Sequence, residues 1–224
     1  MDGLVLDFDG VLVDSEPIHL MGFQRVLEPL GVELKCEDYY GKYLGFDDCE
    51  CLTTALRDNG VSFGDRQIRD LIAAKTAFVK RVLAESATPQ PGVVELIRDS
   101  RDAAVPVAIC SSALREEIEL VARSVGVLDL LAVIVAAEDV PKGKPDPACY
   151  VLTLKRLCEV TGRKLAANRC VAVEDSPFGI AAARGAGMKT LAVTSSYTAG
   201  DLQAADRVVE SLADVTVGSL EQLL

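Results

Sequence analysis

The sequence predicts an α/β fold in which a doubly wound parallel sheet is covered by helices on both faces and an all-helical segment is inserted after the first strand. Short apolar runs alternate with helical patterns from about residue 92 onward, which is typical of parallel strands joined by right-handed helical crossovers. The apolar runs are unbroken, as expected for strands buried on both faces. One further apolar run, at 4–6, precedes a long stretch, 14–88, in which no strand is expected.

The elements before residue 92 follow from local patterns. The strand at 4–6 consists of Leu4-Val5-Leu6 and ends at Asp7. Three helical patterns follow it, at 16–30, 47–59 and 65–84. The first two end at Gly31 and Gly60, since glycine commonly stops a helix, and the third carries apolar residues at helical spacing. The Pro-Gln-Pro-Gly sequence at 89–92 then breaks regular structure.

The elements after residue 92 repeat a helix followed by a strand. The expected pairs are 92–104 with 106–110, 114–125 with 131–136, 147–161 with 169–174, and 177–186 with 190–193. A short helix at 199–205, a strand at 207–209 and a C-terminal helix complete the chain. Because the first strand belongs with these later ones, we expect residues 1–13 and 87–224 to form an α/β core and residues 14–86 to form a separate helical lobe.

Charge and composition exclude several classes of partner. The 224 residues carry 23 Lys and Arg against 34 Asp and Glu, a net charge of −11, which argues against nucleic acid or an anionic membrane as the main partner. The longest apolar run, 130–137, is far shorter than the roughly 18 residues of a membrane span. No signal peptide is expected. The seven scattered cysteines suggest small buried thiols in a cytoplasmic protein. By default we expect a monomer.

Acidic residues gather at the carboxyl ends of two predicted strands. Asp7 and Asp9 follow the first strand, and Glu174 and Asp175 close the strand at 169–174. Ligands of an open parallel sheet bind at this edge, and residues two apart in an extended chain point the same way. Four acids in one crevice repel one another unless a cation lies among them. Oxygen-only ligands favour Mg²⁺.

Groups that could donate hydrogen bonds to an anion follow the neighbouring strands. Ser111 and Ser112 come after the strand at 106–110, and Lys144 lies in the loop after 131–136. A carboxylate nucleophile, a second carboxyl, Mg²⁺, a lysine and hydroxyl groups together suit phosphoryl transfer. Two alternatives stay open: the two serines could simply cap the following helix, and Lys142 could take the place of Lys144.

Four ordered motifs of the chain resemble those of the haloacid dehalogenase superfamily. They are Asp7-Phe8-Asp9-Gly10-Val11-Leu12-Val13-Asp14-Ser15-Glu16-Pro17, then Ser111, then Lys144-Pro145-Asp146-Pro147, then Glu174-Asp175-Ser176. The resemblance covers the whole predicted core and implies a Rossmann-like sheet. The helical insert lies where that superfamily places a C1-type cap, and the subgroup is similar to the β-phosphoglucomutase and phosphoglycolate phosphatase relatives.

The resemblance also implies catalytic roles. Asp7 would attack phosphorus and become an aspartyl-phosphate, and Asp9 would act as acid and then as base. Ser111 and Lys144 would hold the phosphoryl oxygens, with a backbone N–H from Ser112.

The metal and cap residues follow from the same resemblance. Mg²⁺ would be held by the Asp7 carboxylate, the Asp9 carbonyl, Asp175 and Glu174. His19, the one histidine, lies where the mutases also carry one, and it would contact substrate or relay a proton; a polar residue at a domain seam is the equal alternative. The cap would close over the substrate and exclude bulk water.

The function expected from this is a Mg²⁺-dependent phosphatase acting on a small phosphorylated metabolite, such as a sugar, polyol or glycolate phosphate. A sugar-phosphate mutase of the β-phosphoglucomutase type is the alternative, but Leu44 and Asp48 stand where the mutase pattern would place Lys and Arg. Lys42 or Arg115 could replace those cations. A non-catalytic phosphometabolite-binding protein is the third hypothesis, although a pure binder has no need of the second carboxyl, Asp9.

Overall fold

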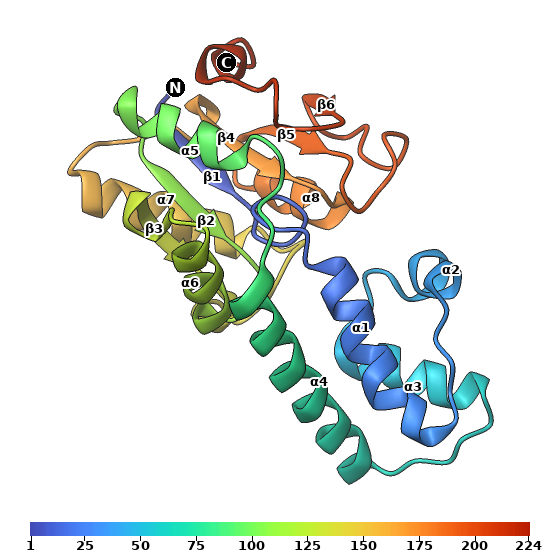
Figure 1. Ribbon diagram of the computed structural model, residues 1–224. Helices are drawn as coiled ribbons and strands as arrows, with labels where there is room; N and C mark the ends of the chain where they lie inside the picture. The colour runs from blue at the N-terminus through green and yellow to red at the C-terminus, as the bar shows by residue number, and fades with distance from the viewer. The chain divides into compact units, whose positions relative to one another are not determined.

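The computed structural model describes all 224 residues, and the chain divides into two compact units (Figure 1). One unit comprises Met1–Asp14 and Ala87–Leu224, and the other comprises Ser15–Ser86. The first unit contains the sheet, and the second contains only helices.

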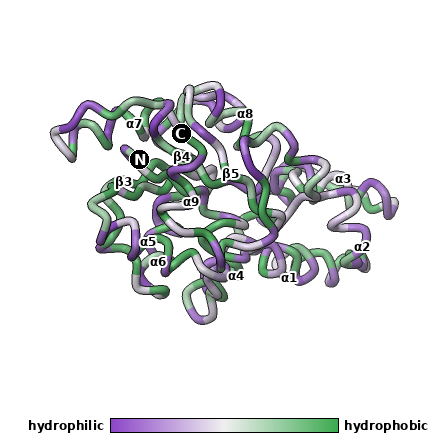
Figure 2. Tube along the Cα trace, turned by 90° about the horizontal axis from the view of Figure 1, so that it is seen from above, coloured by the Kyte–Doolittle hydropathy of each residue, from purple (hydrophilic) through white to green (hydrophobic).

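The sheet has six parallel strands in the order β3-β2-β1-β4-β5-β6. Their bounds are β1 (Gly3–Leu6), β2 (Val107–Cys110), β3 (Leu131–Val135), β4 (Cys170–Glu174), β5 (Lys189–Val193) and β6 (Arg207–Val209). Every residue of β1, β2 and β4 is buried, and the trace through β4 and β5 is mainly hydrophobic in Figure 2. The α/β fold class expected from the unbroken apolar runs is confirmed.

Helices cover the sheet on both faces (Figure 1). They are α5 (Val93–Asp102), α6 (Arg115–Ser124), α7 (Ala148–Thr161), α8 (Pro177–Gly185) and α9 (Val217–Glu221). Helices α7 and α8 pack against each other, α7 contacts β2 and β3, and α8 contacts β4 and β5. Helix α5 contacts β2 and α9. Helix α8 begins as the sequence predicts, because the Ser176 side chain accepts a hydrogen bond from the Gly179 N–H and Pro177 takes the first helical position.

The strand order reverses beside β1, and this positions the candidate site. The chain passes from β1 to β2 and β3 on one side and then returns to β4 on the other. Such a reversal opens a crevice at the carboxyl ends of the two central strands. The register pairs Leu6 with Val173, and the Asp7 N–H donates to the Val173 carbonyl at 3.0 Å. The residues that follow β1 and β4 therefore lie side by side.

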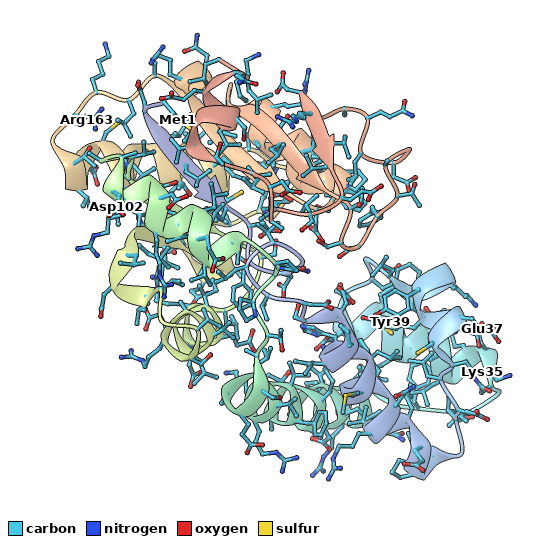
Figure 3. The ribbon with its side chains drawn as sticks, turned by 45° about the horizontal axis from the view of Figure 1, so that its top comes forward. Met1, Lys35, Glu37, Tyr39, Asp102 and Arg163 are labelled. Atoms are coloured by element: carbon cyan, nitrogen blue, oxygen red, sulfur yellow. The ribbon has the colours of Figure 1, made fainter.

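The helical unit consists of α1 (Glu16–Leu27), α2 (Cys36–Asp38), α3 (Asp48–Asp58) and α4 (Asp65–Ser86). A 3₁₀ turn extends α1 to Leu30, and Gly31 ends it in the left-handed conformation at φ +76°. The ring of Tyr39, labelled in Figure 3, is tilted by 44° to that of Phe23, with 5.9 Å between the ring centres. The Tyr39 hydroxyl donates to Glu16 Oε2 at 2.8 Å. No strand interrupts this unit, as predicted.

Two segments differ from the sequence expectation. The helix predicted at 199–205 is wrong: the Asp201 carboxylate accepts hydrogen bonds from the Thr198 N–H and hydroxyl, and consecutive turns form instead. Conversely, α2 and the π-helical turn that continues it, Tyr39–Tyr43, were not expected. Their apolar side chains are too few to show helical periodicity, and only Tyr39 and Tyr43 are buried.

The cysteines differ in burial. All seven are free, but Cys36 and Cys49 are exposed, so the expectation of uniformly buried thiols is wrong for these two. Cys36 begins α2 and Cys49 lies in the first turn of α3, whereas Cys51 faces the core of the helical unit.

The lengths and hydropathy of the helices can be compared with those of a membrane span. None of them combines the length and apolar character that crossing a bilayer requires.

Candidate active site

The loop after β1 presents Asp7 and Asp9 from a rigid turn. Phe8, between them, buries its ring, and its carbonyl accepts hydrogen bonds from the N–H groups of Val11, Leu12 and Val13. The Asp7 carboxyl is largely buried, with the residue 8% exposed. Burial is the main cause of a raised pKa at Asp7; the charge of Lys144 opposes this increase and the charge of Asp9 adds to it.

Lys144 reaches Asp7 from the loop after β3. Its ammonium lies 2.8 Å from Asp7 Oδ1 and 2.6 Å from Glu174 Oε1, and its side chain is only 6% exposed. Burial by itself lowers the pKa of Lys144, but the negative charges of Asp7 and Glu174 outweigh it and hold that pKa well above its usual range. Lys144 is therefore a permanent cation between two carboxylates.

Glu174 and Asp175, at the end of β4, complete the acidic cluster. Glu174 is fully buried, and burial together with the charge of Asp7 raises its pKa. Burial, and next the charge of Asp7, raises the pKa of Asp175 to about 8. Asp175 Oδ2 also accepts a hydrogen bond from the Ser196 hydroxyl at 2.5 Å.

The acidic cluster fits a divalent cation. One oxygen each of Asp7, Glu174 and Asp175 lies within 4.8 Å of the others. Three carboxylates and the single Lys144 ammonium leave two uncompensated negative charges when all are ionised, and the raised pKa values of the acids reflect this excess. Oxygen ligands of this kind suit Mg²⁺. The donor set therefore fits the metal that the sequence predicts.

Ser111 and Ser112 lie differently from each other. Ser111 follows β2, is buried, and its hydroxyl accepts a hydrogen bond from the Ala113 N–H at 2.9 Å. Ser112 is exposed. Neither caps helix α6, whose N-cap is Leu114 without a side-chain hydrogen bond. The capping alternative is therefore wrong for both serines.

The structure also separates the two candidate lysines. Lys142 is exposed, whereas the Lys144 side chain is buried against Asp7.

His19 belongs to a half-buried polar cluster within the helical unit, in which only the Lys75 side chain is buried. Its Nδ1 accepts a hydrogen bond from Lys75 Nζ at 2.8 Å, and Lys75 also pairs with Asp48 Oδ1 at 2.6 Å. Burial, followed by the charge of Lys75, lowers the pKa of His19 to about 4. His19 is thus neutral near pH 7 with its proton on Nε2, so it is poorly suited to relay protons there.

Neither cation suggested as a substitute for the mutase pattern is free. The Lys42 ammonium pairs with Asp58, whose carboxylate also accepts a hydrogen bond from the Tyr43 hydroxyl. The Arg115 guanidinium pairs with Asp139 at 2.6 Å and donates to the Ile134 carbonyl. Each cation is therefore already paired with a carboxylate.

Sequence reasoning missed two polar residues of the site, Ser196 and Tyr150. Ser196 follows β5, the neighbour of β4, so the rule that ligands gather at the strand ends could have indicated it. The Tyr150 hydroxyl donates to Glu174 Oε1 at 2.5 Å from within helix α7. No local signal distinguishes Tyr150 from an ordinary core aromatic residue.

Gly10→Ala is expected to disable the acidic cluster. Gly10 has φ +71°, and a Cβ atom there would lie 1.9 Å from Asp175 Oδ2. The alanine therefore both strains the turn and pushes the Asp175 carboxylate aside. We expect Mg²⁺ affinity, measured by isothermal titration calorimetry, to fall at least about tenfold, with a loss of about 1–3 kcal/mol in the free energy of unfolding.

A matched control is Gly31→Ala, because Gly31 has a similar φ of +76° but a Cβ atom there would meet no other atom within 4 Å. It should lose stability without losing Mg²⁺ affinity. Equal Mg²⁺ affinity in Gly10→Ala and the wild type would contradict the assignment of Asp175 to the metal.

Comparisons with known proteins identify the family of the chain. The family model of the haloacid dehalogenase-like hydrolases matches residues 4–193. The chain is 28% identical to validoxylamine A 7'-phosphate phosphatase of Streptomyces hygroscopicus subsp. limoneus, over 94% of each chain. It is 30% identical to the phosphorylated carbohydrates phosphatase of Thermotoga maritima, over 85% of this chain and 84% of that protein.

A solved structure resembles the chain over nearly its full length. It is that of a CbbY mutant from Rhodobacter sphaeroides in complex with xylulose-(1,5)bisphosphate, with a TM-score of 0.83, 26% sequence identity and 99% of both chains covered.

Proposed function

The chain belongs to the haloacid dehalogenase-like hydrolase family, and on that premise we propose that it is a Mg²⁺-dependent phosphatase that hydrolyses a small phosphorylated metabolite through an aspartyl-phosphate on Asp7. The contact that carries this proposal is the 2.8 Å ion pair between Lys144 and Asp7. It keeps a buried carboxylate beside a permanent cation, which is what a nucleophile attacking an anionic ester needs.

The proposed reaction has two displacements at phosphorus. First, an Asp7 carboxylate oxygen forms a bond to phosphorus while the ester P–O bond breaks, and Asp9 donates a proton to the leaving alkoxide. Water then attacks the phosphorus of the aspartyl-phosphate, Asp9 takes its proton, and the P–O bond to Asp7 breaks. Inorganic phosphate leaves, and both aspartates return to their starting states.

The remaining site residues bind and orient the phosphoryl group. We assign the phosphoryl oxygens to Lys144 and Ser111, with the Ser112 N–H as a further donor. Asp7, Asp175 and the Asp9 backbone carbonyl, with Glu174 beside them, would hold Mg²⁺. When bound, the metal supplies positive charge that offsets the negative phosphoryl oxygens.

The substrate we propose is a phosphomonoester of a sugar, a polyol or glycolate. Two relatives are phosphatases named for phosphorylated carbohydrates and for validoxylamine A 7'-phosphate, which supports a hydroxyl-rich substrate. Lys42 and Lys75 of the helical unit are both neutralised by aspartates. The pairing of these two lysines favours a substrate with one phosphate over the bisphosphate that a mutase must hold. It therefore favours hydrolysis over the mutase reaction.

We further assign residues 14–86 to a cap that closes over the substrate. Closure would exclude bulk water and leave only the attacking water near phosphorus. As a neutral group whose proton is on Nε2, His19 would act in this cap as a hydrogen-bond donor to a substrate hydroxyl.

Hydrolysis of p-nitrophenyl phosphate tests the reaction and the metal together. We expect phosphate release with Mg²⁺, loss of at least about 99% of it after EDTA treatment, and recovery when excess Mg²⁺ is added back. Activity that survives exhaustive metal removal would contradict the role of the acidic cluster, and no release from any ester would favour a non-catalytic binding protein.

Glucose 1-phosphate separates the phosphatase from the mutase. The proposal expects inorganic phosphate and free glucose. Accumulation of glucose 6-phosphate without phosphate release would establish the mutase instead. A panel of sugar, polyol and glycolate phosphates, compared by kcat/KM, then identifies the preferred substrate.

A further inference from the structure

A buried chain of hydrogen bonds lies beneath the proposed nucleophile. Tyr150 of helix α7 is fully buried, and its hydroxyl donates to Glu174 Oε1 at 2.5 Å. Lys144 Nζ donates to the same oxygen at 2.6 Å and lies 2.8 Å from Asp7 Oδ1. The Lys144 ammonium also lies 5.4 Å from the centre of the Tyr150 ring. Tyr150 therefore contacts both partners of the ion pair that serves Asp7.

We propose that Tyr150 is a positioning residue, whose hydroxyl holds the Glu174 carboxylate so that Glu174 in turn fixes the Lys144 ammonium at Asp7. This inference rests on the proposed function, because the position of Lys144 matters for the reaction only if Asp7 attacks phosphorus.

The surroundings of Glu174 leave its carboxylate little freedom. A Cβ atom on Gly179 would lie 1.9 Å from Glu174 Oε2, so helix α8 approaches this side of the carboxylate as closely as a glycine permits. Oε2 accepts a hydrogen bond from the Ser176 hydroxyl at 3.3 Å. Tyr150 and Lys144 occupy the opposite oxygen, Oε1. The carboxylate is thus held between α8 and α7, and Tyr150 is its only uncharged partner on the Lys144 side.

Removing the Tyr150 hydroxyl should shift the Lys144 ammonium from Asp7 toward Glu174. Glu174 is buried, so the lost hydrogen bond to Oε1 cannot be replaced readily by water. The ammonium of Lys144 is then the remaining donor to this oxygen, and Glu174 draws it away from Asp7. The stabilisation of charge at the reacting phosphoryl group falls, which lowers kcat more than it raises KM.

Tyr150→Phe tests this, because it removes the hydroxyl and keeps the buried ring. We expect kcat for p-nitrophenyl phosphate to fall about ten- to a hundredfold, with KM changed less than about threefold. Thr153→Val is the matched control: Thr153 is also fully buried in α7, but its hydroxyl donates at 2.8 Å to the Cys149 carbonyl of its own helix and not to Glu174. It should cost similar thermal stability and leave kcat near that of the wild type.

A second measurement reports the position of Lys144 without turnover. In ¹⁵N-labelled protein free of metal, the protons of a buried ion-paired ammonium exchange with water slowly enough to give a resolved side-chain NMR signal. The signal that disappears in Lys144→Met is that of Lys144. We expect this signal to shift and broaden in Tyr150→Phe and to stay unchanged in Thr153→Val. An unchanged signal and an unchanged kcat in Tyr150→Phe would overturn the inference, as would equal losses of kcat in the two variants. If the wild type hydrolyses no phosphate ester, the proposed function fails while the NMR comparison still tests the positioning.

Discussion

Asp7→Asn is expected to reduce phosphate release by at least about 10⁴-fold while the protein remains folded. The amide has the shape of the carboxylate but is a far weaker nucleophile, so the proposed aspartyl-phosphate would not form. The substitution also removes one of three clustered buried charges, and it is the charge whose repulsion raises the pKa of both Glu174 and Asp175. Stability at neutral pH without metal should therefore be equal to or slightly above that of the wild type.

The measurement is kcat/KM for p-nitrophenyl phosphate, with thermal unfolding monitored in parallel. Asp129→Asn is the matched control, because Asp129 is an exposed acid elsewhere in the same unit and the charge change is identical. It should leave kcat/KM within about twofold of the wild type. Retention of more than a few per cent of activity in Asp7→Asn, after excluding contaminating wild type, would remove Asp7 as the nucleophile.

The fold could be predicted because its signals are local. Each strand of the sheet contains an apolar run of two to five residues. A run of this kind can be recognised in the sequence without knowing which strand it pairs with. The failures are local as well. At 199–205 the Asp201 side chain binds backbone and hydroxyl groups of Thr198, and at 36–43 a short amphipathic helix has too few apolar residues to show its period.

The site could be predicted only where strand ends determine it. Asp7 and Glu174 meet because the β1–β4 register places Leu6 beside Val173, and that pairing follows from the alternation of strands and helices. The contact of Tyr150 with Glu174 spans 24 residues and depends on how helix α7 is rotated against the sheet. Rotation of a helix is set by packing of the whole core, which no short motif encodes. His19 illustrates the same limit, since its pKa is lowered first by burial and then by the charge of Lys75, 56 residues away.

Lys144→Met is expected to impair stability and catalysis together, because one ammonium serves two buried carboxylates. Methionine keeps the apolar length of the side chain but leaves Asp7 and Glu174 without their shared cation. Breaking a buried ion pair in this way costs about 3–5 kcal/mol in the free energy of unfolding. Loss of the donor to the phosphoryl group should lower kcat by about 10²–10³-fold.

Urea denaturation with and without Mg²⁺ distinguishes this from a simple packing defect. A divalent cation in the acidic cluster would supply the positive charge that Lys144 no longer provides, so Mg²⁺ should restore more stability to Lys144→Met than it adds to the wild type. The control is Lys142→Met, two residues away and exposed, which should change neither stability nor kcat. If the two variants behave alike, Lys144 does not neutralise the site. If Mg²⁺ stabilises Lys144→Met no more than the wild type, the metal does not compensate the carboxylates for the lost ammonium.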